Sequence, residues 1–233
     1  MSRLVWIGGA VAVLLLLLVA YGWHLKQRYC WDCTAQERYA QATGLLCDRD
    51  VEERQRGLDI LHELADQGLS APQQLLGGLY LQPLPERFIP LQRELSACVR
   101  SEVPADPALA LVFFRSLAET ELLSPELTYD LGVLVDEGLL QPSGKVRSAR
   151  EYFQQAARDG NPQAMVELGL EQDEQRQYAD AARWFTEAFS RGGVSVAALK
   201  LGDYALYGRE QSADVTEALD WYQKALAAAE SSG

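Results

Sequence analysis

The stretch VAALKLGDYALYGREQSADVTEALDWYQKAL, from Val196 to Leu226, decides the fold of this chain. Its first half predicts one helix up to Gly208, and its second half predicts another helix that begins at Asp214. An aspartate at a helix start accepts hydrogen bonds from the free amides of the first turn. The second helix has one packing face at spacings i, i+3, i+4 and i+7, formed by Ala218, Trp221, Tyr222 and Ala225. The stretch therefore predicts two helices that pack as a hairpin.

The same face recurs four times upstream. The corresponding sets are Gly57, Ile60, Leu61 and Leu64; Ala110, Phe113, Phe114 and Leu117; Ala149, Tyr152, Phe153 and Ala156; and Ala181, Trp184, Phe185 and Ala188. Leucine-glycine pairs mark the partner helices at Leu76-Gly77, Leu131-Gly132, Leu168-Gly169 and Leu201-Gly202. The small residue lets two helix backbones approach, and the aromatic pair fills the space above it. Because one hairpin cannot bury both of its faces, the pattern favours a stacked repeat array over an ordinary bundle of amphipathic helices.

The order of these residues resembles the Sel1-like repeat, a relative of the tetratricopeptide repeat. The last copy carries the match at Leu201-Gly202, Gly208, Asp214, Ala218, Trp221-Tyr222 and Ala225. Three positions depart from the family pattern: Val135 and Ala205 replace a tyrosine, and Pro83 stands where a second glycine is expected. The resemblance covers roughly residues 51–230. It implies an all-α helical-hairpin solenoid that serves as a scaffold for protein complexes, without catalytic residues or a cofactor.

The formal net charge of the 233-residue chain is −12. Residues 1–30 contain three basic residues and no acid, so the acidic excess lies entirely in the rest of the chain. An acidic surface repels phosphate backbones, which argues against binding to nucleic acid. Two explanations remain open: the charge keeps a repeat array soluble, or an acidic groove receives a basic segment of a protein partner.

The run LVWIGGAVAVLLLLLVAYGW, residues 4–23, is uncharged and long enough to cross a bilayer as a helix. A cleaved signal peptide is the alternative, but the apolar run is longer than a usual signal core. Basic residues flank both ends, and their count leans slightly toward a cytoplasmic domain. Anchored proteins of the resembled type often face the bacterial periplasm. We therefore expect a single-pass protein of the bacterial inner membrane with a periplasmic repeat domain.

The chain has four cysteines: Cys30, Cys33, Cys47 and Cys98. In an exported domain four cysteines usually form two disulfides, and three connectivities are possible. A thiol-active Cys-x-x-Cys at Cys30 and Cys33 is the alternative function, namely disulfide exchange by a membrane protein. A zinc site built from the cysteines or His62 lacks a matching second ligand pair, so we expect no metal.

Three domains are expected. Residues 1–28 form the anchor and its stem, residues 29–56 form a cysteine-containing linker helix, and residues 57–230 form the repeat domain. A proline-rich insertion at about residues 82–106 interrupts the repeats and holds one helix near residues 91–100. The dipeptides Asp106-Pro107, Ser124-Pro125 and Asn161-Pro162 each place a capping residue before a proline, which predicts three helix starts. The polar segment 171–177 is expected to be exposed.

No catalytic motif is present, and we predict neither an enzyme nor a small-molecule substrate. A repeat array offers its concave side to protein partners, and the first helix of each hairpin lines that side. Tyrosine suits such contacts because it combines apolar area with a hydroxyl group. The candidate partner-binding residues are Tyr80, Asp136, Glu167, Asp203, Tyr204 and Tyr207.

Overall fold

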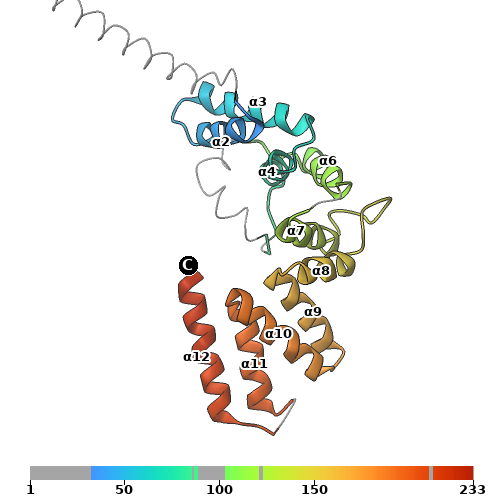
Figure 1. The fold of residues 1–233 in the computed structure, drawn as a ribbon, viewed down its shortest axis with the longest axis vertical. Helices are drawn as coiled ribbons and strands as arrows, with labels where there is room; N and C mark the ends of the chain where they lie inside the picture. The colour runs from blue at the N-terminus through green and yellow to red at the C-terminus, as the bar shows by residue number, and fades with distance from the viewer. Residues whose placement is uncertain (1–32, 86, 89–102, 121–122, 210–211, 233) are drawn as a thin grey trace, which may run out of the picture. The chain divides into compact units, whose positions relative to one another are not determined.

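The computed structural model describes residues 33–85, 87–88, 103–120, 123–209 and 212–232, and every regular element in these ranges is an α-helix (Figure 1). The helices are α2 (Ala35–Leu45), α3 (Val51–Asp66), α4 (Ser70–Tyr80), α6 (Pro107–Ala118), α7 (Pro125–Asp136), α8 (Ala149–Arg158), α9 (Pro162–Glu174), α10 (Tyr178–Gly192), α11 (Ser195–Tyr207) and α12 (Val215–Ser232). The all-α prediction is confirmed for these ranges.

Several predicted features lie outside the described residues. They are the transmembrane segment at residues 4–23, the helix at residues 91–100, and the cysteines Cys30 and Cys98. Among the helices that are described, none combines the length and the apolar character that a membrane span requires. The membrane anchor therefore stays a prediction.

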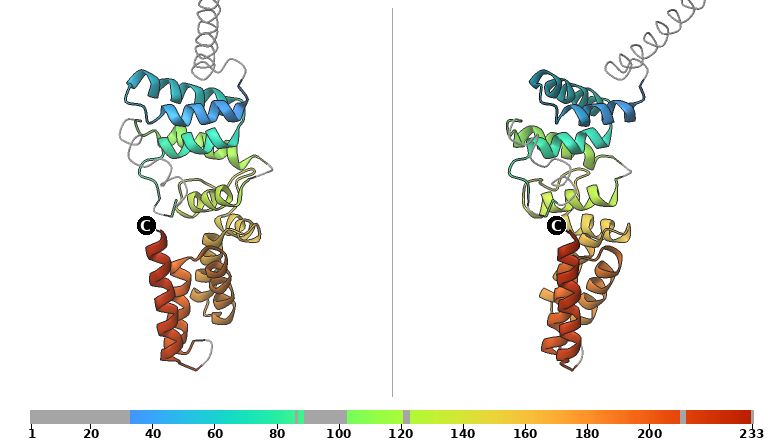
Figure 2. Two further views of the ribbon diagram at one scale, coloured as in Figure 1. Left: turned by 60° about the vertical axis from the view of Figure 1, so that its left-hand side comes forward. Right: turned by 90° about the vertical axis from the view of Figure 1, so that its left-hand side faces the viewer.

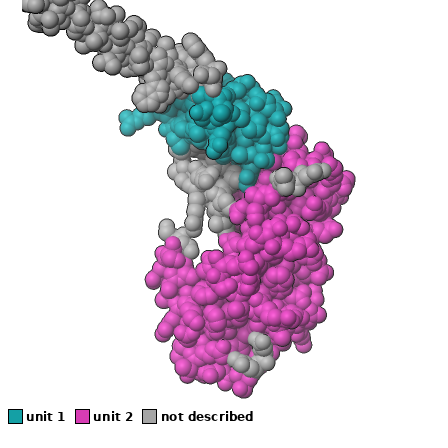
Figure 3. All heavy atoms as spheres, viewed as in Figure 1, with its two compact units in different colours: residues 1–79, 95–104 teal, residues 80–94, 105–233 magenta. Residues whose placement is uncertain are grey.

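The chain divides into two units, residues 1–79 with 95–104 and residues 80–94 with 105–233, which Figure 3 colours separately. In the first unit α2 packs against α3. Gly57 of α3 lies at this contact, because a Cβ atom added to it would be 2.9 Å from the carbonyl oxygen of Ala42. Leu61 and Leu64 are fully buried on the same face of α3, as the packing pattern predicted.

The second unit contains three consecutive hairpins, α7–α8, α9–α10 and α11–α12. Each hairpin packs on the next through α8 against α9 and α10 against α11. The two views of Figure 2 show α11 and α12 side by side. One core of buried side chains runs through this unit from Leu81 to Tyr204. These contacts confirm a helical-hairpin repeat array.

All three predicted proline starts are confirmed. The side chains of Asp106, Ser124 and Asn161 accept hydrogen bonds from the amides of Leu109, Leu127 and Ala164, at 3.0, 3.1 and 2.8 Å. Asp214 caps the last helix in the same way, with its Oδ1 2.8 Å from the amide nitrogen of Thr216. The capping residues alone therefore predicted where these helices begin.

The leucine-glycine pairs and the aromatic pairs meet as the sequence pattern predicted. A Cβ atom added to the glycine would be 2.7 Å from Phe153 Cε1 at Gly132, and 2.5 Å from Tyr222 Cε1 at Gly202. Contacts as short as these exclude any side chain larger than glycine unless the ring moves. In each of these repeats, a glycine of the first helix packs directly against an aromatic ring of the second helix.

Candidate functional site

Two of the predicted partner-binding residues, Asp136 and Glu167, converge on Arg87, which precedes α6. The Nη2 atom of Arg87 lies 2.6 Å from Asp136 Oδ2 and 2.8 Å from Glu137 Oε1. Its Nη1 atom lies 3.3 Å from Glu167 Oε1. Asp136 and Glu137 come from the end of α7, and Glu167 comes from α9 of the next repeat. One guanidinium therefore joins carboxylates from two successive first helices.

This cluster carries a net negative charge. Partial burial disfavours the charged guanidinium, but hydrogen bonds to Glu137, Asp136 and Glu167 outweigh burial and raise the pKa of Arg87. The hydroxyl of Tyr129 donates to Glu167 Oε1 at 3.4 Å, and burial next to this carboxylate raises the pKa of Tyr129. Three carboxylates share one cation, so the cluster keeps an acidic excess that suits a basic partner group.

A second cluster is centred on Asp173, near the end of α9. Its carboxylate accepts from Lys200 Nζ at 3.0 Å, from the Tyr204 hydroxyl at 2.7 Å and from Arg209 Nη1 at 3.1 Å. Burial opposes the charge, but these hydrogen bonds and cations lower the pKa of Asp173. The guanidinium of Arg209 also lies 5.3 Å from the ring centroid of Tyr178. The cluster ties the end of α9 to the first helix of the following repeat.

The expectation that residues 171–177 are exposed was wrong for Asp173. Helix α9 continues to Glu174, and the Asp173 side chain is only 12% exposed. The run was expected to be exposed because its composition is very polar. In the structure the carboxylate is instead held by partners that come from α11 and from the residue after Gly208.

The other predicted residues have separate surroundings. Tyr80 stacks on Phe113, with ring centroids 6.4 Å apart. Asp203 accepts from the Tyr222 hydroxyl at 2.8 Å, and burial together with this bond raises the pKa of Tyr222 to about 12. Tyr207 is exposed, whereas Tyr204 is 3% exposed. Tyr204 is therefore a core residue rather than an exposed anchor, and the six residues do not form one continuous surface.

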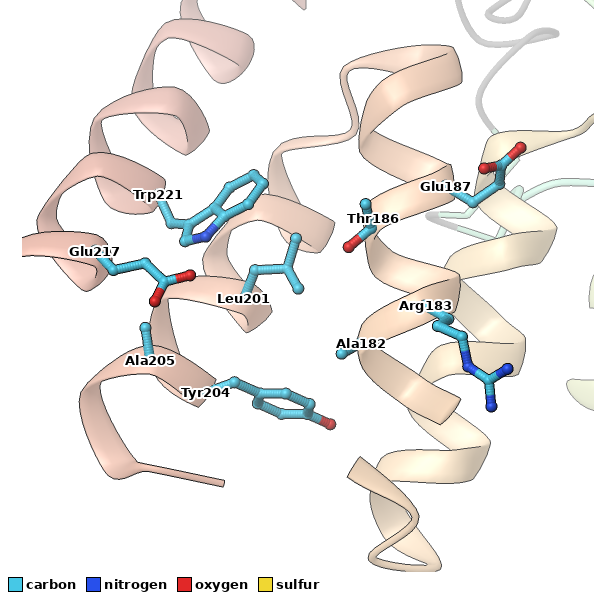
Figure 4. Close-up of a pocket in the computed structure, with 9 residues that line it drawn as sticks. All are labelled: Ala182, Arg183, Thr186, Glu187, Leu201, Tyr204, Ala205, Glu217 and Trp221. Atoms are coloured by element: carbon cyan, nitrogen blue, oxygen red, sulfur yellow. The ribbon is translucent and has the colours of Figure 1, made fainter. Parts of the chain in front are cut away.

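A groove of about 470 Å³ lies between α10, α11 and α12. Its lining residues are Ala182, Arg183, Thr186, Glu187, Leu201, Tyr204, Ala205, Glu217 and Trp221. Figure 4 shows Trp221 and Leu201 between α12 and α10, with the Glu217 carboxylate on the same side. The charged ends of Arg183 and Glu187 point away toward the other side of α10 (Figure 4). The groove thus combines apolar side chains with polar ones in about equal measure and has a carboxylate at its edge.

The Trp221 indole packs against two neighbouring side chains. Its ring meets Phe189 edge-on, with centroids 5.7 Å apart, and Lys224 Nζ lies 4.1 Å from its centroid. A large aromatic ring that is fixed in this way makes an effective anchor at an interface, because little conformational freedom is lost on binding. Trp221 is therefore the side chain in the groove best suited to contact a partner.

The cysteines are described only in part. Cys33 and Cys47 are both disulfide-bonded, and neither of them is a free thiol. The connectivity and the thiol-exchange hypothesis stay predictions, because Cys30 and Cys98 lie outside the described residues. No group of three or more potential metal ligands occurs in the part of the chain that the structure describes.

Sequence reasoning missed Arg87, Asp173 and the groove. Arg87 lies in the insertion and has no counterpart in the repeat pattern. The groove was missed because the predicted residues lie on first helices, and only Tyr204 among them lines the groove, whereas most of the lining comes from the second helices α10 and α12. Small residues at Ala182 and Ala205 were the available signal, because alanines beside larger side chains leave space.

The family model of the Sel1 repeat matches residues 125–161, 162–193 and 195–229. These segments coincide with the hairpins α7–α8, α9–α10 and α11–α12. A Sel1 repeat protein from Oxalobacter formigenes has a similar structure, with a TM-score of 0.59 and 19% identity over 83% of this chain and 71% of that chain. The Pseudomonas aeruginosa protein PA5086 gives a TM-score of 0.51 and 21% identity over 86% of this chain and 69% of that chain.

The immunity protein PA5088 from Pseudomonas aeruginosa gives a TM-score of 0.50 and 19% identity, over 84% of this chain and 66% of that chain. At these identities the likeness shows the fold alone. Comparison with curated proteins found no match. Residues 125–229 thus match three Sel1 repeats, and the fold resembles that of a solved Sel1 repeat protein.

Proposed function

Since residues 125–229 form Sel1 repeats, we propose that this protein is a non-enzymatic, membrane-anchored scaffold that holds a protein partner in a bacterial cell envelope. The apolar run at residues 4–23 supports the anchor, and the disulfide bonds of Cys33 and Cys47 support an exported domain. The repeat domain then faces the periplasm.

The groove between α10 and α12 is the observation that carries the partner-binding proposal. It exposes the held Trp221 ring over a floor of Leu201 and Ala205, and Glu217 stands at its edge. An apolar or aromatic side chain of a partner fits the floor, and a lysine or arginine next to it meets Glu217. The acidic excess around Arg87, on the neighbouring repeats, favours the same basic character in the partner.

Binding of a partner in the groove is tested by a substitution that fills the groove. Thr186 is exposed on the groove side of α10, so Thr186→Tyr fills the entrance without disturbing a buried contact. Thr216→Tyr is the matched control, since Thr216 is exposed on α12 and does not line the groove. Each full-length variant is purified from its native membranes, and the recovered proteins are quantified by mass spectrometry.

We expect a specific partner to be recovered with the unchanged protein and with Thr216→Tyr. Recovery with Thr186→Tyr should fall by about tenfold, which corresponds to about 1.4 kcal/mol of binding free energy. Equal recovery with both variants would contradict binding in the groove.

The location is tested by labelling thiols in intact cells with a membrane-impermeant maleimide, with and without prior reduction. An exported domain with disulfides is labelled only after reduction. Labelling that requires cell lysis would place the domain in the cytoplasm and contradict the envelope assignment.

A further inference from the structure

The last hairpin leaves a row of apolar side chains in solvent. Four of them form what we call the terminal face, namely Leu199 of α11 together with Val215, Leu219 and Leu226 of α12. Their exposed fractions range from 48% at Leu199 to 63% at Leu226. Val215, Leu219 and Leu226 follow one side of α12 at spacings of four and seven residues, so they form a continuous stripe.

The repeat register shows what this face corresponds to. Aligning the leucine-glycine pairs and the alanine positions assigns each residue of the terminal face a counterpart in the two preceding hairpins. The counterparts in α9–α10 are Val166, Tyr178, Ala182 and Phe189, in the order Leu199, Val215, Leu219 and Leu226. The counterparts in and before α7–α8 are Tyr129, Val146, Arg150 and Ala157, in the same order.

These counterparts face the following hairpin. The ring of Tyr178 meets Tyr204 of α11 at 5.6 Å, and that of Phe189 meets Trp221 of α12 at 5.7 Å. Arg150 pairs with Glu171 of α9 at 3.3 Å. The counterparts that are at most 7% exposed are Tyr129, Val146, Ala157, Val166 and Ala182. The positions exposed on the terminal face are thus the positions that a following helix covers elsewhere in the same array.

The helices that cover these positions bury the same kinds of side chain. Helix α11 contributes Ala197 and Leu201 to the core that it shares with the preceding hairpin, and both are buried. Helix α9 does the same with Ala164 and Leu168. A helix whose buried stripe consists of small residues and leucine is therefore the shape that fits the terminal face.

The charge of the last hairpin indicates which side chains should flank the apolar stripe of the docked helix. Residues 195–232 contain six acidic residues and three basic ones, so the hairpin is acidic. Lys200 and Arg209 are engaged by Asp173, and Lys224 pairs with Asp220 at 2.7 Å. A second copy of this chain would bring the same acids to the interface, which like-charge repulsion disfavours. A helix with lysine or arginine beside its apolar stripe is favoured instead.

We propose that the terminal face docks an amphipathic helix of a partner protein, with an alanine and leucine stripe flanked by basic side chains. The docked helix takes the place that the next first helix occupies in the array. This inference rests on the proposed scaffold function and adds a second contact site, separate from the groove, together with the kind of helix that binds there.

The probe is a stapled helical peptide that copies residues 195–208 with Asp203→Lys, and the comparison peptide keeps the aspartate. The staple holds the short peptide helical, because isolated helices of this length are marginal in water. Binding to the purified full chain is measured by fluorescence anisotropy. The receptor variant is Val215→Ser with Leu219→Ser, and the control is Val112→Ser with Leu139→Ser. Val112 and Val215 match closely, at 62% and 61% exposed.

We expect the lysine peptide to bind more tightly than the comparison peptide, and more weakly as salt increases. The Val215→Ser and Leu219→Ser variant should weaken binding by about tenfold, because two apolar contacts are lost. The control variant and Thr186→Tyr should leave binding unchanged. Because Thr186→Tyr closes the groove and leaves the terminal face intact, the two binding sites are tested independently of each other.

Three results would overturn the assignment. They are no binding of the lysine peptide, equal losses in the receptor variant and its control, or self-association of the chain that the receptor variant abolishes. The last result, seen by sedimentation velocity, would assign the face to a second copy. Both serine variants replace exposed residues, so their unfolding midpoints should stay close to that of the unchanged protein.

Discussion

Gly169 of α9 lies directly beneath the ring of Phe185 of α10. A Cβ atom added to Gly169 would be 2.6 Å from Phe185 Cε1 and 2.8 Å from its Cδ1. Phe185 is fully buried, and its ring also meets Tyr204 edge-on at 5.9 Å. The Phe185 ring is therefore packed against the next hairpin as well as against Gly169. This contact fixes the distance between the two helices of the central repeat.

We predict that Gly169→Ala destabilises the repeat domain by about 1–3 kcal/mol, because the added methyl group overpacks the contact. Gly44 in α2 provides the control. A Cβ atom there meets nothing within 4 Å, so Gly44→Ala should be neutral or stabilise by about 0.5–1 kcal/mol. Urea unfolding of each full-length variant measures the difference.

The assignment to Phe185 is tested by a double-mutant cycle. Phe185→Leu removes the atoms that the new methyl group would meet, so Gly169→Ala should cost less in the Phe185→Leu background than in the unchanged protein. An equal cost in both backgrounds would show that the penalty arises elsewhere.

Asp173→Asn should destabilise the protein by about 1–3 kcal/mol. The substitution removes the charge that Lys200, Tyr204 and Arg209 share at a largely buried site. The neighbouring Glu174 is exposed, so Glu174→Gln should change the free energy of unfolding by less than about 0.5 kcal/mol. Similar losses in the two variants would argue against a special role for Asp173.

The contribution of Asp173 should also depend on pH. Its folded-state pKa is lowered from an ordinary value of 3.8. The stabilisation is therefore fully present above about pH 4, and it is lost as the pH falls through the lower folded-state pKa. The free-energy difference between the unchanged protein and Asp173→Asn should be constant from about pH 5 to pH 7 and shrink in more acidic solution. A difference that grows with acidity would contradict the direction of the shift.

Arg87→Gln should lower stability, because it leaves Asp136, Glu137 and Glu167 close together without their shared cation. We expect a modest loss of about 1 kcal/mol at low salt, since the carboxylates are partly exposed. Added salt should reduce the loss by screening the repulsion. Arg115 is exposed on α6, and Arg115→Gln serves as the control with no comparable salt dependence. A loss that salt does not reduce would exclude charge repulsion as its cause.

The titration of Tyr222 should depend on Asp203. Burial raises the pKa of Tyr222, and the carboxylate of Asp203 raises it further by accepting a hydrogen bond from the neutral phenol, to about 12 in total. Tyrosinate absorbance, compared with that of Tyr222→Phe, isolates this group. Asp203→Asn should shift its titration toward the ordinary tyrosine value of about 10. An unchanged midpoint would contradict the contribution of the hydrogen bond.

Local signals predicted the fold well. Capping residues before prolines located the starts of α6, α7 and α9, and the glycine-aromatic pattern paired the helices of each repeat correctly. Both signals depend on neighbouring residues or on one contact within a hairpin, so they can be read from the sequence. The departure of Ala205 from the family pattern did not change the pairing.

The candidate site was less predictable because it depends on contacts between repeats. Asp136 and Glu167 were chosen for their places on first helices, and only the structure shows that Arg87 joins them. Tyr204 looked like an exposed anchor, but its ring completes the core between Tyr178 and Phe185. Whether a residue of the repeat is exposed depends on what the next hairpin places over it. That information is not contained in a single helix.

The central claim is that the groove between α10 and α12 holds a protein partner. It is tested most directly by placing a photo-crosslinking amino acid at position 186 in living cells, with position 216 as the control. We predict one defined adduct at position 186 and none at position 216, with mass spectrometry placing the crosslink on a partner segment that has an apolar anchor beside a basic residue. The same adducts at both positions, or none at position 186 while the protein is folded in its membrane, would contradict the account.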